Sequence, residues 1–321
     1  MASLGYNGLG FGLLDAASEG SMQDLVSLLD QHADVNFIDQ DGNIPLHTAA
    51  SHGHLQCMAL LLDRQADINP VDVEDSSPLH AASWNGHSQC IEMLLDRHAD
   101  INLTNLYGST PLHDASRRGH PQCIEILLDR HADITAVDRR GCTPLHDASR
   151  NGHRRCVEIL LDRHADINAI DQDKTTPLHV VARNGHHQCI ELLLDRHADV
   201  NAADFNRNTP LHCASVSGHH QFIELLLDRH ASIDAVNRHG DTALHDASRS
   251  PHRQCTELLL DRGASRSITN VRHPPSPCYP FSCCLDLHNV RARVVPLTSS
   301  DIDRITTEHL NKLHTLLLLH S

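Results

Sequence analysis

The chain has 321 residues and a formal net charge of −15; 40% of its residues are hydrophobic, but only 3% are aromatic. This length suits one elongated array or two globular domains, whereas so few rings disfavour a large cofactor pocket walled by aromatic side chains. The acidic balance argues against general binding to a phosphate backbone, which needs a basic surface. We therefore expect no cofactor and no nucleic-acid partner.

The first residues give no sign of export. Met1 to Leu14 lacks the basic region and the continuous apolar run of a signal peptide. The longest apolar run near the other end, Leu316 to Leu319, is far shorter than the about 20 residues that cross a bilayer. We expect a soluble monomer without a membrane span, located in the cytoplasm, with the nucleus as the alternative.

A motif recurs with a fixed period. Pro45 and Pro78 lie 33 residues apart, and each is followed by Leu-His. The same spacing continues through Pro111, Pro144, Pro177 and Pro210, and Ala243 takes the next place. Such a period indicates a stack of identical supersecondary units. Aligned on this motif, units one to eight are about 6–38, 39–71, 72–104, 105–137, 138–170, 171–203, 204–236 and 237–269.

The local structure of one unit can be predicted from unit six. Thr176 can cap a helix, and Pro177 fits its first turn, where a missing N–H costs nothing. This short helix should stop at Gly185, which readily takes a positive φ. A second helix is expected at about 188–196, followed by an extended and turning connection at 199–204. Neither helix is stable alone, so we expect stacking to stabilise both.

These residues carry a specific resemblance. The segment Gly108 to His113 reads Gly-Ser-Thr-Pro-Leu-His, and Gly-His, Leu-Leu and Ala-Asp-Ile-Asn follow at fixed offsets. This pattern resembles the ankyrin repeat and covers about 6–269. The resemblance implies an all-α, slightly curved solenoid of helix-turn-helix units with hairpin or loop fingers on one side. It also implies a non-enzymatic scaffold that binds other proteins through the fingers and inner helices.

The chain departs from the family pattern at three kinds of position. The family usually has Gly after the second helix, and this chain has it only at Gly263. We expect the other residues to keep the left-handed geometry, because His tolerates it. Lys174 and Arg207 replace the finger glycine in units six and seven, which puts the hairpin shape there in question. Pro251 replaces the glycine that ends the inner helix of unit eight. The residues after the second helix are His32, Gln65, His98, His131, His164, His197 and His230.

One cysteine and one histidine recur in most units. Stacked helices lie roughly 8 to 10 Å apart, which is too far for a disulfide, and one thiol per layer cannot build a four-ligand zinc site. We expect buried thiols and histidines that tie loops together, without metal binding or catalysis. The cysteines are Cys57, Cys90, Cys123, Cys156, Cys189 and Cys255, and the histidines are His47, His80, His113, His146, His179, His212 and His245.

Binding residues are expected where the units differ, because the scaffold is constant elsewhere. Exposed Trp, Tyr and Arg carry much of the binding energy at interfaces. Our candidate protein-binding residues are Trp84, Tyr107, Arg117, Arg118, Arg139, Arg140, Arg150 and Arg183. The hypothesis is a partner that docks across units three to five, with an acidic feature meeting the arginines.

The alternative for the arginines is local pairing on a solvated helix. Asp114 precedes Arg117 by three residues, and the same spacing recurs at Asp147–Arg150 and Asp246–Arg249. Arg183 has Val180 at that place and lacks such a partner.

Loop asparagines also recur. They resemble the family's asparaginyl hydroxylation sites, although unmodified turn-forming residues are the interpretation that we favour. They are Asn36, Asn69, Asn102, Asn168 and Asn201.

The repeat pattern ends near residue 269. We expect a linker rich in Pro and Cys at 270–298. Cys278, Cys283 and Cys284 are too closely grouped, with only His288 nearby, for a convincing zinc site. An amphipathic helix is expected at 299–321, where it could cap the last repeat.

A second function is suggested by the scarcity of lysine. Only Lys174 and Lys312 occur among 26 Lys and Arg residues. A substrate-recognition subunit of a cullin-type ubiquitin ligase would show this composition if it escaped modifying itself. Its recruiting element would be the C-terminal tail, in which Pro296-Leu297 and the following helix faintly resemble the start of an F-box. The adaptor of such a ligase is therefore the alternative partner.

Overall fold

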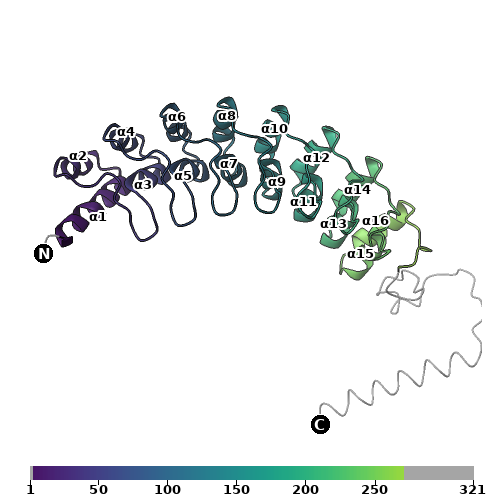
Figure 1. Ribbon diagram of the computed structural model, residues 1–321. Coiled ribbons are helices and arrows are strands. Elements are labelled where there is room, and N and C mark those ends of the chain that lie inside the picture. Colours follow the sequence, from purple (N-terminus) through teal and green to yellow (C-terminus); the bar gives the residue numbers. More distant parts are fainter. Residues whose placement is uncertain (1–2, 271–321) are drawn as a thin grey trace, which may run out of the picture. The chain divides into compact units, whose positions relative to one another are not determined.

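The computed structural model describes residues 3–270, which form sixteen α-helices and no strand within that range (Figure 1). The predicted linker, the closely spaced cysteines and the predicted terminal helix lie outside the described residues. No helix among the described residues is long and apolar enough to span a membrane. The all-α prediction is therefore confirmed for the repeat region.

The helices alternate between an inner and an outer row. The inner helices are α1 (Ser3–Glu19), α3 (Pro45–His52), α5 (Pro78–Asn85), α7 (Pro111–Arg118), α9 (Pro144–Arg150), α11 (Pro177–Asn184), α13 (Pro210–Ser217) and α15 (Ala243–Arg249). The outer helices are α2 (Met22–Asp30), α4 (Leu55–Asp63), α6 (Ser88–Asp96), α8 (Pro121–Asp129), α10 (Arg154–Asp162), α12 (His187–Asp195), α14 (His220–Asp228) and α16 (Arg253–Asp261).

Local chemistry sets the ends of these helices. In α11, Thr176 is the N-cap, and its hydroxyl accepts a hydrogen bond from the His179 N–H. Gly185 ends the helix with a φ of 86°, as the sequence predicts. The outer helix α12 begins and ends one residue earlier than expected, because His186 takes the N-cap position.

Stacking creates one continuous core. Each inner helix packs on its own outer helix and on the next inner helix, and outer helices contact in the same order. In unit six, Leu178, Cys189, Ile190 and Leu193 are fully buried and join a cluster that extends through the whole row. Each short helix is thus stabilised by its neighbours rather than by its own length.

Most residues that replace the usual glycines keep the left-handed backbone conformation. His197 has a φ of 64°, and Lys174 and Arg207 have φ values of 58° and 61°. The left-handed geometry expected after the second helix is therefore retained, and the fingers of units six and seven keep their turn. Pro251 does alter the end of α15, where Ser250 is extended rather than left-handed.

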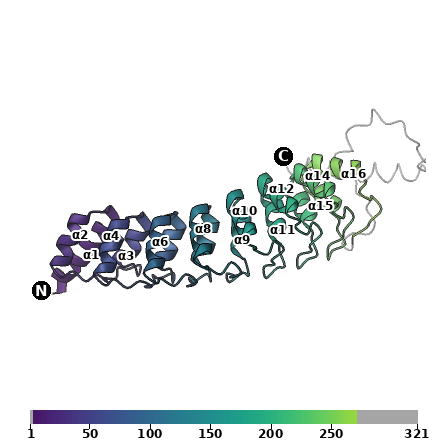
Figure 2. The same ribbon diagram turned by 90° about the horizontal axis from the view of Figure 1, so that it is seen from above.

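The fingers are loops that contact one another along one side of the row (Figure 2). Neighbouring fingers share a backbone hydrogen bond, such as Arg139 N–H to Tyr107 O at 2.9 Å and Gln172 N–H to Arg140 O at 2.9 Å. Loop asparagines add a second link, because Asn102 Oδ1 accepts from the Asp133 N–H at 2.9 Å. Backbone hydrogen bonds therefore hold neighbouring fingers together, although the described residues form no strand.

Candidate protein-binding surface

The histidine of the Pro-Leu-His motif joins two units. In unit four, Nδ1 of His113 accepts from the Thr110 N–H at 3.2 Å, and Nε2 donates to the Cys142 carbonyl of the next finger at 3.0 Å. Burial lowers the pKa of His113, so its neutral form makes both bonds. The same contact is made by His47, His80, His146, His179 and His212. These side chains are structural, as the sequence predicts.

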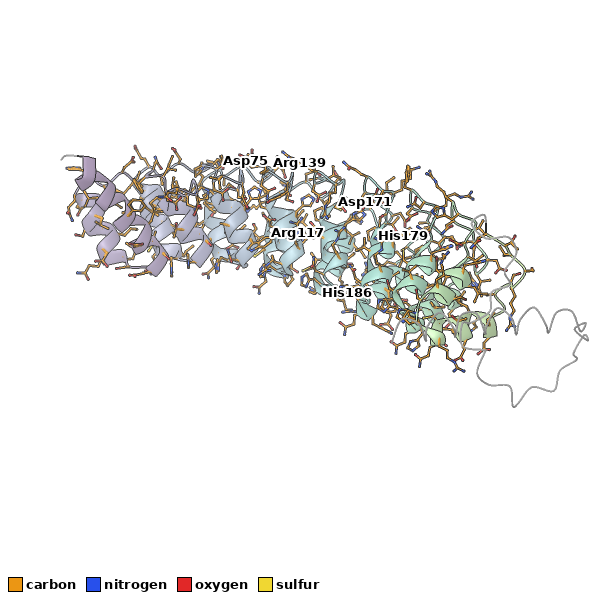
Figure 3. All side chains as sticks on the ribbon, turned by 90° about the horizontal axis from the view of Figure 1, so that it is seen from below. Asp75, Arg117, Arg139, Asp171, His179 and His186 are labelled. Carbon is orange, nitrogen blue, oxygen red and sulfur yellow. The ribbon has the colours of Figure 1, made fainter. Side chains whose placement is uncertain are left out.

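A second column of recurring histidines, at the N-cap of the outer helices, was not predicted from the sequence. His153 Nε2 donates to the Arg117 carbonyl of the preceding unit at 3.1 Å. Its ring lies against Gly119, where an added Cβ would be 2.5 Å from Nδ1. His186 makes the equivalent contact in the next unit, and Figure 3 shows it away from the finger edge. This column therefore fixes the spacing of the units.

The recurring cysteines are buried and neutral. Burial raises the pKa of Cys123 and Cys156 to about 12, so both thiols stay protonated and act as small apolar groups. Between residues 3 and 270, no group of three or more His, Cys, Asp and Glu side chains is placed to hold a metal ion.

The aromatic candidates line a groove of about 610 Å³ formed by units two to four, which we call the N-terminal groove. Trp84 is 38% exposed and Tyr107 is 53% exposed. The guanidinium of Arg118 lies over the Trp84 ring, 4.8 Å from its centroid. Besides these aromatic residues, the walls include Asp72, Glu74, Asp114 and Arg117.

The arginines at the far end of the candidate set line a different groove, of about 310 Å³, in units five and six. We call it the C-terminal groove. Arg140, Arg150 and Arg183 lie on its walls together with Asp171 and Asp173. The structure thus places three of the predicted residues in each groove, and Arg118 and Arg139 line neither.

The alternative interpretation of the inner-helix arginines, local pairing within one helix, is wrong for two of the three pairs. Arg117 binds Asp147 of the next unit at 2.9 Å instead of Asp114. Arg150 makes no ion pair within 4.0 Å to Asp147 or to any other described carboxylate. Arg249 does pair with Asp246 and also binds Asp241. Contacts between layers therefore decide which inner-helix charges are neutralised.

The carboxyl group of Asp114 has no hydrogen bond or ion pair among the described residues, although the residue is only 4% exposed. Burial raises the pKa of Asp114 to about 7, and the nearby Arg117 charge opposes this rise. The structure therefore places a carboxyl group of unusual pKa on the wall of the N-terminal groove.

The exposed finger tips change the sign of their charge along the row. Figure 3 shows Asp75 and Arg139 on the same edge. The tips of units two and three carry Asp41, Glu74 and Asp75, and those of units five to eight carry Arg139, Arg140, Lys174, Arg207 and Arg238 together with one acidic residue, Asp173. A partner that spans the row therefore meets acidic tips first and mostly basic tips later.

The outer helices carry a ladder of ion pairs that join neighbouring units. Arg163, for example, binds Asp129 of the preceding unit at 2.8 Å. The same pair recurs at Arg64–Asp30, Arg97–Asp63, Arg130–Asp96, Arg196–Asp162, Arg229–Asp195 and Arg262–Asp228. Exposed pairs of this kind are worth about 0 to 1 kcal/mol each, so we assign them to the register of stacking.

Comparisons with known proteins agree with this architecture. The family described as ankyrin repeats (3 copies) matches residues 13–105, 98–171, 164–237 and 203–270. A crystal structure of the human ASB11 ankyrin repeat domain is 31% identical, with a TM-score of 0.64, and the match covers 73% of this chain and 100% of that one. It is one of 611 matching chains, so the fold is too common to identify a partner. No curated protein matches this chain.

Proposed function

This chain belongs to the ankyrin repeat family, and from that premise we propose that it is a non-enzymatic scaffold that binds other proteins. The observation that carries the proposal is the division between constant and variable side chains. The recurring His and Cys are buried and hold the units together, whereas Trp84, Tyr107 and Arg139 are exposed on the inner helices and fingers. Exposed aromatic and Arg residues are typical anchors of protein interfaces.

The partner docks across units three to five. The exposed Arg139 and Arg140 on the finger of unit five support an acidic feature on the partner, because Arg140 has only a weak contact to Asp138 at 3.5 Å. Trp84 and Tyr107 add an exposed aromatic area one to two units away. Arg117 contributes less, since its charge is neutralised by Asp147. The protein acts as a monomer in the cytoplasm.

Proximity labelling in the native cell tests this proposal. The full chain should label a reproducible set of proteins, and the double variant Arg139→Glu/Arg140→Glu should lose its acidic partners. The matched control is Arg154→Glu/Arg155→Glu, because it makes the same charge change on the outer helix α10. Equal loss in both double variants would show a general effect of charge. Unchanged labelling by the finger variant would remove this docking site.

A second function is supported by the lysine content. Lys174 and Lys312 are the only lysines in the chain, and a subunit that holds substrates near a ubiquitin-conjugating enzyme benefits from few acceptor groups. In this alternative the array selects substrates, and residues 270–321 recruit a cullin-type ligase.

Co-purification of the full chain with a cullin adaptor, compared with a chain that ends at residue 269, tests this alternative. Loss of the adaptor on truncation supports it. Partners that remain bound to the truncated chain, with no adaptor bound to either form, would favour the simple scaffold.

A further inference from the structure

One inner-helix ion pair, Arg117–Asp147, joins two neighbouring units, and the next two units lack an equivalent pair. Arg117 reaches the carboxylate that lies 30 residues ahead, at Asp147 in the next unit. The equivalent partner of Arg150 is Val180, and the equivalent partner of Arg183 is Cys213. Val180 and Cys213 are both buried and carry no negative charge at this place. Two consecutive guanidinium groups therefore lack the partner that Arg117 has.

The contacts that these arginines do make are weak. Arg150 Nη2 donates to Cys142 Sγ at 3.4 Å, and Arg183 Nη2 donates to Cys213 Sγ at 3.6 Å. Sulfur is a poor acceptor compared with a carboxylate. In addition, Nε of Arg150 is buried and has no hydrogen-bond partner among residues 3–270. Most N–H donors of Arg150 and Arg183 thus have no acceptor in the described part of the chain.

The acidic residues of the same groove do not replace the lost partners. Asp171 and Asp173 line the C-terminal groove with Arg150 and Arg183. However, Asp171 Oδ1 already accepts from the N–H groups of Asp173 and Thr175. Neither carboxylate lies within 4.0 Å of the two guanidinium groups in the described part of the chain.

Building on the scaffold function proposed above, we propose that Arg150 and Arg183 together bind two carboxylates of one extended acidic segment of the partner. Arg suits this role, because its planar fork binds a carboxylate through two parallel hydrogen bonds. The C-terminal groove holds both arginines at one opening, so a single segment can reach them together.

The distance between layers sets the spacing of the two acidic residues. Packed helices lie about 8 to 10 Å apart, and Arg150 and Arg183 occupy equivalent places in neighbouring inner helices. A polyproline II segment repeats every three residues and rises about 3.1 Å per residue, so residues i and i+3 share a face about 9 Å apart. The preferred motif is therefore two acidic residues separated by two others.

Selection of peptides on the full chain tests the motif. The probe is a phage-displayed library of random dodecapeptides, and we expect enrichment of Glu or Asp at positions i and i+3. Peptides without this acidic pair, or no enrichment at all, would overturn the inference. Phosphorylated versions of the selected peptides distinguish a carboxylate-binding site from a phosphate-binding site. Tighter binding of phosphoserine than of Glu at either position would contradict a carboxylate-binding site.

A variant at the two positions that lack an acidic residue tests the proposal directly. Val180→Asp/Cys213→Asp supplies the missing internal carboxylates while leaving both arginines in place. The selected peptide should bind at least about tenfold more weakly, because a lost charge-assisted hydrogen bond is worth at least a factor of about ten in affinity. The control Val180→Asn/Cys213→Asn has the same shape without the charge and should bind within about twofold of the wild type.

Equal binding to the Asp and Asn variants would overturn the proposal. A fold defect cannot explain a difference between them, provided that circular dichroism gives both variants the same melting transition. Native partners that still label the Asp variant would leave the scaffold function standing and remove only this site. The scaffold function itself fails only if the full chain labels no partner.

Discussion

Arg117 donates a hydrogen bond of 2.9 Å to the carboxylate of Asp147, which lies one repeat further along the chain. Asp114, three residues earlier on the same helix, is not its partner. The ion pair of Arg117 thus joins two neighbouring units instead of two residues of one helix. Asp114 is left without an ion pair at one end of the series and Arg150 at the other, among the residues that the structure describes. A contact that stabilises the stack thus leaves Asp114 in the N-terminal groove and Arg150 in the C-terminal groove without a partner of opposite charge.

The Arg117–Asp147 pair should contribute measurably to stability. Asp147 is 1% exposed, and within the described part of the chain its Oδ1 atom already lacks a hydrogen-bond partner. Arg117→Gln leaves this buried carboxylate without its cation, and we expect a loss of about 2 kcal/mol, as for other hydrogen bonds to charged groups. Urea denaturation followed by circular dichroism measures the loss.

The neighbouring Arg118 is a suitable control for this measurement. It is exposed and lies over the Trp84 ring, a contact worth about 0.5 to 1 kcal/mol at such a site. Arg118→Gln should therefore cost less than Arg117→Gln. Equal costs for the two variants would show that the contact between layers contributes little.

The glycine that ends the inner helix α7 is the basis of a second prediction. Gly119 has a φ of 77°, and a Cβ there would lie 2.5 Å from the His153 ring. Gly263, which follows the outer helix α16, has a φ of 90°, and no described atom lies within 4 Å of the added Cβ. Both Ala variants incur the backbone cost of about 1 to 2 kcal/mol, and only Gly119→Ala must also displace a ring.

Gly119→Ala should therefore lower the free energy of unfolding by at least about 1 kcal/mol more than Gly263→Ala, a typical cost of overpacking a well-filled contact. Thermal and urea melts of the two variants measure the difference. If the two substitutions cost the same, the histidine column does not set the spacing of the units.

The helices could be predicted from the sequence because their signals are local. Pro177 and Gly185 mark the two ends of α11, and the repeat copies these signals along the chain. The contact made by His186 could not be predicted from local signals. The His186 ring crosses to the Arg150 carbonyl in the preceding unit, a contact that no pattern within one unit reveals.

The exposure and contacts of the candidate binding residues could be predicted only in part. Variability between units is a sequence property, and it correctly selected Trp84 and Tyr107 as exposed residues. The partner of Arg117 was missed because the spacing within one helix favoured Asp114, whereas the bond is made 30 residues ahead. No pattern within one helix shows this contact, because it depends on the packing of neighbouring units.

Acid should destabilise the array through its buried histidines. Burial lowers the pKa of His80 to about 4, and the pKa values of His47, His113, His146 and His179 are lowered for the same reason. The unfolded chain takes up these protons first, near pH 6.5. The stability that the neutral rings provide is thus complete above about pH 6.5 and is lost as the pH falls toward 4.

Urea midpoints at pH 7.5, 6 and 5 measure this effect. The measurement uses the Asp114→Asn chain, because Asp114 has the opposite pH dependence. We expect a steady fall in the midpoint, and a smaller fall when His80→Gln is added. A midpoint that stays constant from pH 7.5 to 5 would contradict neutral buried rings.

Asp114 should destabilise the fold at high pH. Burial raises its pKa from 3.8 to about 7, the Asp147 charge adds to the rise, and the Arg117 charge opposes it. The folded state therefore holds a proton that the unfolded chain releases near pH 4. The stability that this proton provides is complete below about pH 4 and is lost as the pH rises through about 7.

Asp114→Asn removes the charge and keeps the shape, so its advantage over the wild type should grow from pH 4 to pH 8. One pKa unit corresponds to about 1.36 kcal/mol, which gives a total change of roughly 4 kcal/mol for this shift. Urea denaturation at both pH values measures it. Asp147→Asn is the matched contrast, because it removes the partner of Arg117 and should lower stability at pH 8. If both variants change stability in the same direction at pH 8, the assignment of Arg117 to Asp147 rather than Asp114 is wrong.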